Sequence, residues 1–298
     1  ELNRVLCEKL EDKMKGTGVE GTIAKLFEGT THCFVRGVTQ KDVNSTRTES
    51  FMDLQLDVKG CLDVYASFDA YTAVETLEGA NQYKSDEHGL IDAQKGVLFE
   101  SLPPVLVLQL KRFEYDYARD AMVKVNDRYE FPEELDLDVG GRKYLAAGAD
   151  RGVRNAYRLH SVLVHSGGVH GGHYYAFTRP DGTRWLRFDD ERVTVEEAGR
   201  AVDDNFGAGG ANDAAGDRGL AALAPGRCAN AYMLVYVRAS DWPAIMCPVS
   251  VEADIPAHVR ARLVREAADR ERRRREKQEA HLFRTLRLAR SADFARQA

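Results

Sequence analysis

Cysteine is scarce in this sequence, and no long apolar run occurs in it. The five cysteines among 298 residues are odd in number and never show Cys-x-x-Cys spacing. Such a pattern argues against a disulfide framework and indicates reduced thiols, as in the cytoplasm and the nucleus. No apolar segment approaches the roughly 20 residues that a membrane-spanning helix needs. The composition therefore favours a soluble globular protein over a membrane protein or a disulfide-rich secreted domain.

Positive charge is also in short supply over most of the chain. Residues 1–250 contain 29 Lys and Arg against 39 Asp and Glu, whereas residues 251–298 contain 13 against 8. An acidic body favours a basic partner over nucleic acid. The arginine run 272–275 lies within residues 260–281, a strongly charged stretch with little apolar stripe, which predicts a solvated linker helix. A nucleic-acid contact or a localisation signal is the alternative for the arginine run.

Hydrophobic periodicity predicts helices near both ends of the chain and strands between them. Helical spacing occurs in residues 1–15, between Val64 and Thr76, and after Pro256. From Thr22 to Val107 the pattern otherwise predicts strands. The clearest strand patterns, alternating or continuously apolar, are at residues 51–58, 105–110 and 231–237. Glycine-rich surface loops are predicted at residues 139–155 and 201–227. Residues 281–288 have the pattern of the beginning of a strand.

The most informative stretch runs from Leu159 to Phe177 and reads as strand, glycine-rich loop, strand. Its first part alternates apolar and polar residues, and its aromatic second part is compatible with an extended backbone. Between them four glycines surround His170, and His173 opens the returning strand. Glycine lets a backbone approach something that side chains would exclude. A histidine at the lip of such a loop can exchange protons near neutral pH.

A second part of the pattern follows at Trp185–Asp190, after a turn centred on Asp181-Gly182. An Asp-Gly turn predicts a hairpin that places the strand ending in Phe188 beside the strand beginning at His173. Asp189, 16 residues after His173, is then expected within hydrogen-bond reach of it. A carboxylate that holds an imidazole in one tautomer is the orienting half of a nucleophilic triad. No nucleophile is apparent in the same stretch.

Other interpretations of this stretch stay open at this point. His165, His170 and His173 have the chemistry of zinc ligands, although no thiolate or carboxylate pattern nearby completes a tetrahedral set. A phosphate loop is weaker, because no Gly-Lys-Ser or Gly-Lys-Thr ends the glycines and no helix pattern follows. A structural hairpin that carries histidines is the simplest alternative to His/Asp catalysis.

Several motifs, in order along the chain, resemble the ubiquitin-specific protease family. The segment His165–Tyr174, followed by Trp185 and Phe188–Asp190, resembles the histidine box of that family. Segments 106–113 and 230–236 resemble its central and last strands. Shorter phrases resemble the herpesvirus-associated branch of the family and its plant and algal relatives, at residues 12–17, 19–23, 102–104, 126–132 and 279–282. The resemblance covers nearly the whole chain and excludes only the two glycine-rich loops.

The resemblance implies an α+β fold, papain-like at its active site, with thumb, palm and fingers. An antiparallel β-rich core and a C-terminal helix belong to this fold. Residues 1–240 would be the catalytic domain, divided into a thumb remnant, mostly fingers, and palm at residues 1–20, 21–102 and 103–240. Residues 241–281 would be a charged helical linker, and residues 282–298 the start of a ubiquitin-like domain.

The resemblance also implies roles for single residues. His173 would be the general base that makes a cysteine thiolate, Asp189 would orient it, and Asp190 would assist or replace Asp189. The loop ending in Gly171 and Gly172 would lie over the C-terminal tail of ubiquitin and admit only its Gly-Gly end. Five side chains match positions expected to line the tail channel: Phe113, Tyr115, His165, Tyr174 and Tyr232. For Tyr232, packing in the core is the alternative.

Two departures from the family pattern limit these expectations. No segment matches the cysteine box of the family, and the chain opens with Glu1-Leu2, without initiator methionine or signal peptide. We therefore expect a partial chain that lacks the nucleophile and is inactive by itself. Residues 31–36 and 83–88 replace the two Cys-x-x-Cys pairs that hold zinc in many members. One cysteine cannot hold a structural zinc, so we expect no metal and no other cofactor.

The sequence thus predicts part of a deubiquitinating thiol protease, which would hydrolyse the bond after the C-terminal glycine of ubiquitin. Its partners would be ubiquitin and ubiquitinated proteins, not nucleic acid or a membrane, and its location the cytoplasm and nucleus. The alternative is a ubiquitin-binding module without catalytic activity.

Overall fold

The computed structural model describes residues 2–207, 229–246 and 254–282. The chain splits into two compact units, residues 1–246 and residues 247–298. The first unit contains every described strand and confirms the predicted α+β class, with a core built on largely antiparallel sheets.

The first unit combines short helices with many strands. Its helices are α1 (Leu2–Met14), α2 (Thr22–Phe27), α3 (Val64–Tyr71), α4 (Val139–Arg142), α5 (Ala198–Ala201) and α6 (Trp242–Ile245). Its described 3-10 turns are η1 (Gly79–Asn81) and η2 (Asp203–Asn205). Its strands are β1 (Gly29–Gly37), β2 (Asn44–Phe51), β3 (Leu54–Asp57), β4 (Glu75–Leu77), β5 (Tyr83–Ser85), β6 (Gly89–Ile91), β7 (Ala93–Ser101), β8 (Val105–Lys111), β9 (Phe113–Asp116), β10 (Ala121–Lys124), β11 (Glu134–Asp136), β12 (Ala156–Gly168), β13 (Gly171–Thr178), β14 (Trp185–Asp189), β15 (Arg192–Glu196) and β16 (Ala229–Arg238).

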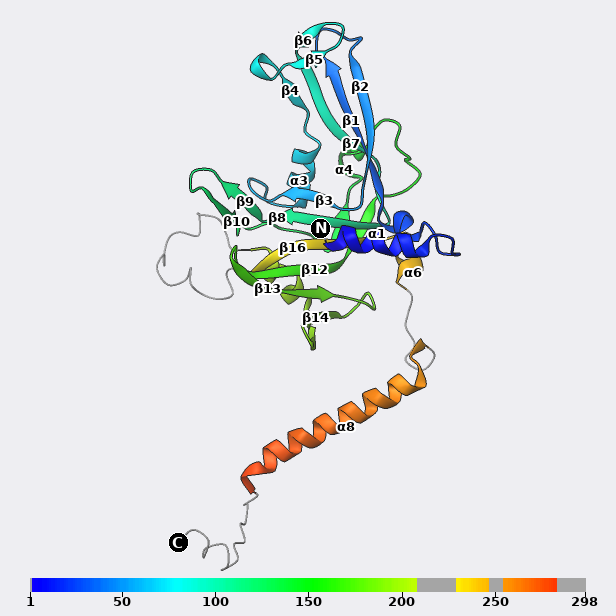
Figure 1. The fold of residues 1–298 in the computed structure, drawn as a ribbon, viewed down its shortest axis with the longest axis vertical. Helices are drawn as coiled ribbons and strands as arrows, with labels where there is room; N and C mark the ends of the chain where they lie inside the picture. Colours follow the sequence, from blue (N-terminus) through cyan, green and yellow to red (C-terminus); the bar gives the residue numbers. More distant parts are fainter. Residues whose placement is uncertain (1, 208–228, 247–253, 283–298) are drawn as a thin grey trace, which may run out of the picture. The chain divides into compact units, whose positions relative to one another are not determined.

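Two sheets organise the first unit (Figure 1). The smaller sheet has the order β2-β1-β7-β4, and the larger sheet has the order β15-β14-β13-β12-β16-β8-β3, with β11 also paired to β12. In the larger sheet β3 pairs parallel to β8, and the other pairings are antiparallel. Figure 1 shows the smaller sheet at one end of the unit and α3 next to β3. The division into thumb, fingers and palm stays a prediction.

The core joins the larger sheet to the elements that pack on it. The two strands predicted to be buried, β8 and β16, are buried along most of their length. The predicted short helix is α3, and its N-cap residue is Asp63, whose carboxylate accepts a hydrogen bond from the N–H of Ala66. Phe68 of α3 packs against Phe99 of β7 and against Tyr144. Through these rings, α3 connects the smaller sheet with the core.

The strand prediction that starts at Thr22 is wrong for its first 6 residues, which form α2. Gly21 precedes this helix with a φ of 75°, a conformation that favours glycine. The carboxylate of Glu11 accepts hydrogen bonds from the N–H groups of Gly21 and Ile23 over 2.7 and 3.3 Å. A side chain of α1 therefore caps α2 from outside, which a local sequence pattern does not reveal.

The alternating segment 51–58 is shared between the two sheets and is not one strand. Phe51 ends β2, in the smaller sheet, and Leu54 begins β3, in the larger sheet. Between them the buried carboxylate of Asp53 accepts a hydrogen bond of 2.8 Å from Arg4 of α1. This ion pair holds the turn, while the leucines of β3 stay buried as their alternation predicts.

Residues 139–155, predicted as a surface loop, pack in part against the core. Tyr144 is 1% exposed, and its ring centroid lies 5.4 Å from that of Phe68. The N–H of Phe99 donates to the carbonyl of Tyr144, and the carbonyl of Phe99 accepts from the N–H of Ala146. This main-chain pairing with β7 buries a segment whose composition resembles that of a loop.

The second predicted loop, residues 201–227, also begins in the core. Ala201 and Phe206 are buried, and the ring of Phe206 meets that of Phe131 edge-on, with centroids 4.9 Å apart. The surface-loop prediction is therefore wrong for these first residues. Residues 208–227, the remainder of that prediction, lie outside the described residues.

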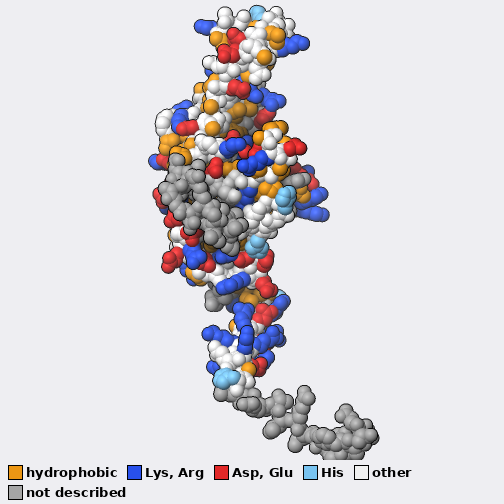
Figure 2. Space-filling view, turned by 90° about the vertical axis from the view of Figure 1, so that its left-hand side faces the viewer, with side chains coloured by type: hydrophobic (Ala, Val, Ile, Leu, Met, Phe, Trp, Pro, Cys, Tyr) orange, Lys and Arg blue, Asp and Glu red, His pale blue; other side chains and the backbone are white. Residues whose placement is uncertain are grey.

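The described part of the second unit is a single long helix. It comprises α8 (Ala257–Glu279) and the 3-10 turn η5 (Ala280–Leu282). No residue of α8 is buried, which confirms the predicted solvated helix. On the face of the protein drawn in Figure 2, acidic and basic side chains are interspersed. The strand prediction that starts at His281 is wrong for its first two residues, which belong to the 3-10 turn η5. Residues 283–298 lie outside the described residues. Among the described helices, none is both long and apolar enough to cross a bilayer.

Candidate active site

The predicted strand–loop–strand segment is the hairpin of β12 and β13. Its strands pair as far as Gly168 and Gly171, which leaves Val169 and His170 in the turn. Gly167 adopts a φ of 123°, and a Cβ there would lie 2.6 Å from the carbonyl oxygen of Gly171. Because the two strands approach so closely, the hairpin itself requires glycine at this position.

His173 and Asp189 lie within hydrogen-bond distance, as the hairpin pattern predicts. β13 and β14 pair with Ala176 opposite Phe188, so the start of one strand lies near the end of the other. Nε2 of His173 donates to Oδ1 of Asp189 over 2.5 Å. Because an ionised carboxylate only accepts, Nε2 carries the proton, and Nδ1 of the neutral ring keeps a lone pair. Within the described part of the chain no hydrogen bond uses Nδ1, so this atom can accept a proton from a reacting group.

This pairing shifts the pKa values of both residues. The hydrogen bond to Asp189 raises the pKa of His173, and the charges of Asp189 and Asp190 act in the same direction. The same hydrogen bond lowers the pKa of Asp189, and the charge of Arg187 lowers it further. The side chain of His173 is 48% exposed, so a substrate can reach it. Such an exposed imidazole, held by a carboxylate, has the properties of a general base.

Asp190 lies beside the pair without a hydrogen bond to the imidazole. It occupies the turn between β14 and β15 with a φ of 51°, an uncommon conformation for a residue other than glycine. One of its carboxylate oxygens lies within 4.8 Å of a ring nitrogen of His173 and of a carboxylate oxygen of Asp189. Asp190 therefore adds negative charge near the imidazole but does not fix the ring.

Four of the five side chains predicted to line the tail channel form one ring cluster beside the hairpin. The centroid of His165 lies 4.6 Å from that of Tyr174 and 5.4 Å from that of Phe113. The centroid of Tyr232 lies 5.9 Å from that of Tyr174 and 6.1 Å from that of Phe113. His165 is buried, whereas Tyr174 is 55% exposed. The cluster thus has an inner side in the protein and an outer side in contact with solvent.

Tyr232 reaches this cluster from an irregular point of β16. Leu163 of β12 pairs with Met233, whereas Val164 pairs with Ala231, so Tyr232 is an extra residue between them. A β-bulge of this kind re-aims a side chain and is frequent next to active sites.

Tyr115, the fifth predicted channel residue, lies outside the cluster. It belongs to the hairpin of β9 and β10, is 43% exposed, and its hydroxyl donates to the carboxylate of Asp120. Its ring packs edge-on against Tyr117, with centroids 5.2 Å apart. The structure therefore brings four of the predicted channel residues together, whereas the described contacts of the fifth, Tyr115, are with Tyr117 and Asp120.

The surroundings of His165 make it a packing residue rather than a base. A Cβ on Gly172 would lie 2.1 Å from its Nε2, so the ring rests on the glycine. Its Nδ1 is buried without a hydrogen-bond partner among the described residues. Burial lowers the pKa of His165, and the charge of Lys124 lowers it further. The Nζ of Lys124 donates to the carbonyls of His165 and Gly167, each over 3.0 Å, and so ties β10 to the glycine hairpin.

The described cysteines offer His173 no hydrogen-bonded nucleophile. Cys7 is buried in α1, and this burial raises the pKa of its thiol. Cys33 lies in β1, and Cys61 packs against the core. Cys228 and Cys247 lie outside the described residues. None of the three described thiols is therefore assigned as a nucleophile.

A second group of side chains deserves comparison with a metal site. Asp42, Glu87 and His88 bring their ligand atoms within 4.8 Å of one another. All three are exposed, and Nε2 of His88 already forms a 2.7 Å hydrogen bond with Asp42. A structural zinc in proteins has four ligands, mostly thiolate and imidazole. These three exposed residues fall short of that set, so we assign no metal to them.

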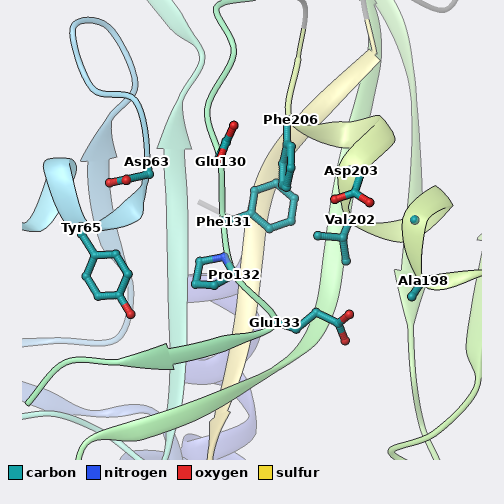
Figure 3. Close-up of a pocket in the computed structure, with 11 residues that line it drawn as sticks. Asp63, Tyr65, Glu130, Phe131, Pro132, Glu133, Ala198, Val202, Asp203 and Phe206 are labelled. Atoms are coloured by element: carbon teal, nitrogen blue, oxygen red, sulfur yellow. The ribbon is translucent and has the colours of Figure 1, made fainter.

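A pocket of about 540 Å³, whose lining residues are drawn in Figure 3, includes neither His173 nor Asp189 in its lining. It is lined by Asp63, Tyr65, Glu130, Phe131, Pro132, Glu133, Ala198, Gly199, Val202, Asp203 and Phe206. None of these is a predicted site residue. Its carboxylates Glu130 and Glu133 already pair with Arg128 and Arg179 over 2.9 and 3.0 Å. We therefore place the chemistry at the hairpin and not in this pocket.

Comparison with known proteins decides the family. Residues 1–236 match the family described as ubiquitin carboxyl-terminal hydrolase. The chain belongs to that family. It is 57% identical to Ubiquitin C-terminal hydrolase 12 of Arabidopsis thaliana, over 100% of this chain and 27% of that protein. It is 47% identical to Ubiquitin carboxyl-terminal hydrolase 15 of Schizosaccharomyces pombe, over 97% of this chain and 25% of that protein.

A solved structure supports the same assignment. The SAGA Ubp8/Sgf11/Sus1/Sgf73 DUB module bound to ubiquitin aldehyde matches with a TM-score of 0.55 and 26% identity. The match covers 72% of this chain and 42% of that chain. Together with the family, it confirms the predicted fold class of the ubiquitin-specific protease type. The chain spans about a quarter of the length of the curated relatives named above.

Sequence reasoning missed two basic residues at the site. The first is Lys124, whose hydrogen bonds to carbonyls more than 40 residues away give no sequence signal. The second is Arg187, whose NH2 group donates to Oδ2 of Asp189 over 2.7 Å. Its position two residues before Asp189 on a strand could have placed both side chains on one face of the sheet.

Proposed function

We propose that the chain is the catalytic-domain part of a deubiquitinating thiol protease, in which His173 and Asp189 carry the acid–base chemistry. The observation that carries this proposal is the 2.5 Å hydrogen bond between His173 and Asp189, at the lip of a glycine hairpin. The proposed cleavage site is the bond after the last glycine of ubiquitin, and membership of the ubiquitin carboxyl-terminal hydrolase family supports this choice.

In the proposed reaction Nδ1 of His173 takes the proton of a cysteine thiol, and the thiolate attacks the carbonyl carbon of ubiquitin's last glycine. The imidazolium, stabilised by Asp189, then gives its proton to the leaving amine while a thioester forms. A water molecule, deprotonated by the same imidazole, releases the ubiquitin carboxylate and restores the thiol. Asp190 supports the imidazolium by its charge. No cysteine of this chain is proposed as the nucleophile, so the chain by itself is proposed to be inactive.

Recognition of ubiquitin is proposed to take place at its C-terminal tail. The glycine loop that ends in Gly171 and Gly172 would lie over the tail and admit only its Gly-Gly end; a Cβ at Gly171 would meet nothing within 4 Å, whereas the imidazole of His165 fills that space at Gly172. The exposed ring of Tyr174 and the cluster behind it offer a wall for an extended peptide. The tail of ubiquitin carries arginines, which suits a body with an excess of Asp and Glu over Lys and Arg. Tyr115 stays a predicted contact.

We also propose a finer placement within the family. The phrases at residues 12–17, 19–23 and 126–132 support the herpesvirus-associated branch. The exposed helix α8 supports residues 241–281 as a linker, and residues 282–298 are proposed to begin a ubiquitin-like domain. The free thiols of the described cysteines support a reducing location, the cytoplasm and nucleus.

The proposal is tested with the full-length product of the gene and a fluorogenic amide of the ubiquitin C terminus. The wild type is expected to release the fluorophore, and His173→Ala is expected to bind ubiquitin but lose hydrolysis by between about 10²-fold and 10⁴-fold. Full activity of His173→Ala would rule out its role as the general base. A wild type that binds ubiquitin and never cleaves it would instead identify a binding module.

A further inference from the structure

Asp189 has a second partner besides His173. Its Oδ1 accepts from Nε2 of His173 over 2.5 Å, and its Oδ2 accepts from an NH2 group of Arg187 over 2.7 Å. The two carboxylate oxygens therefore serve two different donors. The Arg187 and Asp189 side chains are only 32% and 25% exposed, so this ion pair is partly shielded from water.

Arg187 is held in place by an aromatic ring. Its Cζ lies 4.2 Å from the ring centroid of Tyr175, a distance at which cation–π attraction operates. The ring of Tyr175 in turn lies 6.2 Å from that of His173. Strand alternation puts His173 and Tyr175 on one face of β13, next to Arg187 and Asp189 on the same face of β14. These four side chains form a closed circle of contacts.

We propose that Arg187 is a positioning residue, which fixes the rotation of the Asp189 carboxylate so that Oδ1 faces Nε2 of His173. The inference rests on the proposed role of His173 as the general base. The terminal torsion of an aspartate is soft, so a carboxylate with a single donor can turn away. A charge-assisted hydrogen bond from the planar guanidinium to the other oxygen removes this freedom.

Arg187 contributes orientation, because proximity is already secured by the main chain. Asp189 ends β14, where it pairs with Arg192 of β15, and the pairing of β14 with β13 keeps the strand beside His173. Without Arg187 the carboxylate therefore stays close to the imidazole but loses its preferred angle. The Nε of Arg187 is buried without a hydrogen-bond partner among the described residues, and a buried unpaired donor costs free energy. Burial alone therefore does not favour this position of the Arg187 side chain.

The charges around His173 allow the proposal to be tested by sign. Asp189 and Asp190 face the imidazole and raise the pKa of His173, whereas the charge of Arg187 lowers it. Loss of Arg187 from an intact pair should therefore raise the pKa of His173. Loss of the hydrogen bond between His173 and Asp189 should lower the pKa of His173 toward its ordinary value, because this hydrogen bond is the largest cause of the raised pKa.

The first experiment is an NMR pH titration of His173 in the 298-residue chain, comparing the wild type with Arg187→Met. Arg184→Met is the matched control, since Arg184 pairs with Asp181 over 2.8 Å in the turn between the same two strands and has no bond to Asp189. We expect a lower pKa of His173 in Arg187→Met, because the freed carboxylate loses the hydrogen bond that is the largest cause of the raised pKa, and an unchanged pKa in Arg184→Met. A higher pKa in Arg187→Met would show that the pair stays intact without Arg187, and a higher or unchanged pKa would overturn the proposal.

The second experiment measures hydrolysis of the ubiquitin amide by the full-length product. Arg187→Met is expected to lower kcat by between about 10-fold and 100-fold, with KM within about twofold, because orientation matters in the reaction and not in binding. Arg187→Lys should recover part of this loss, and Arg184→Met should match the wild type. A kcat of Arg187→Met equal to that of the wild type would contradict the role. If the wild type itself fails to cleave ubiquitin, the proposed function fails, while the titration still decides the placement of Arg187.

Discussion

Gly172 lies directly against the imidazole of His165. A Cβ at Gly172 would come within 2.1 Å of Nε2 of His165 and within 2.7 Å of the carbonyl oxygen of Ser166. The ring cannot retreat freely, because it also packs against Phe113 and Tyr174. The glycine that precedes the proposed base therefore determines where the ring cluster sits.

Replacement of this glycine should disturb both stability and turnover. Gly172→Ala is expected to lower the free energy of unfolding by about 1–3 kcal/mol, as overpacking does in dense sites. Hydrolysis of the ubiquitin amide by the full-length product that carries Gly172→Ala should also be slower. The matched control is Gly168→Ala in the same hairpin, where a Cβ meets nothing within 4 Å. Chemical denaturation of both variants checks this, and equal stabilities would contradict the packing of Gly172 against His165.

The hydrogen bond between His173 and Asp189 should appear in the titration of His173. Asp189→Asn removes the carboxylate that raises the pKa of His173, so this pKa should fall. Asp190→Asn should lower it less, because Asp190 acts by its charge alone. NMR titration of the ring measures both changes. A larger fall of the pKa in Asp190→Asn than in Asp189→Asn would show that Asp190 is the main partner of His173 and would contradict this prediction.

The same shift affects stability in a defined pH range. A histidine whose pKa is raised on folding stabilises the fold below its unfolded pKa, near 6.5, and this contribution disappears as the pH rises through the folded-state value. The stability difference between wild type and Asp189→Asn should therefore include a component that is present in mildly acid solution, where His173 is protonated and Asp189 is ionised, and that is lost toward alkaline pH. Denaturation at several pH values from mildly acid to alkaline measures it, and a component that grows with pH over this range would have the wrong sign.

The two adjacent carboxylates should rank in their effect on turnover. Asp189→Ala is expected to lower kcat on the order of 10²-fold, since the base loses its orienting partner. Asp190→Ala should cost less, and the double variant should be slower than Asp189→Ala if Asp190 substitutes in part. Kinetics of the three variants in the full-length product decide this. Full activity in the double variant would remove both carboxylates from the mechanism.

Arg112 is predicted to be a critical residue for stability. Its side chain is 1% exposed, and its guanidinium donates to main-chain carbonyls at Val125, Asp127, Phe206 and Ala231. Burial lowers the pKa of Arg112 to about 10, so the group is still charged at neutral pH. Arg112→Met leaves these carbonyls without their donor and should cost about 3 kcal/mol or more of unfolding free energy.

Arg119→Met is the control for this prediction. Arg119 pairs with Asp116 over 3.5 Å, and its side chain is 75% exposed. Its replacement should change the unfolding free energy by less than about 0.5 kcal/mol. Urea denaturation compares the two variants, and similar midpoints would show that the buried guanidinium does not stabilise the fold.

Much of the site could be predicted from the sequence because it is local. The pairing of β13 with β14 follows from alternation and from one Asp-Gly turn, and it brings His173 near Asp189 across 16 residues. The buried strands β8 and β16 are equally clear, because a continuous apolar run has few other placements. These elements owe their form to their own residues.

The remainder depends on partners that are distant in sequence. Residues 139–155 have the composition of a loop, yet Tyr144 is buried by Phe68, far earlier in the chain. The membership of Tyr232 in the ring cluster depends on a bulge in the pairing of β12 and β16, and the hydrogen bonds of Lys124 depend on the position of the glycine hairpin. No local pattern encodes such register and packing, so only the folded chain reveals them.

The most direct test of the central claim is a titration of isotope-labelled ubiquitin with the 298-residue chain, followed by heteronuclear NMR. We expect shifts that begin at the C-terminal tail of ubiquitin and extend to its globular face. The Tyr174→Ala variant should no longer shift the resonances of the tail. Ubiquitin without its C-terminal residues should bind more weakly. A folded chain that shifts no resonance of ubiquitin, or shifts only residues remote from the tail, would contradict the claim that the glycine hairpin and its ring cluster receive that tail.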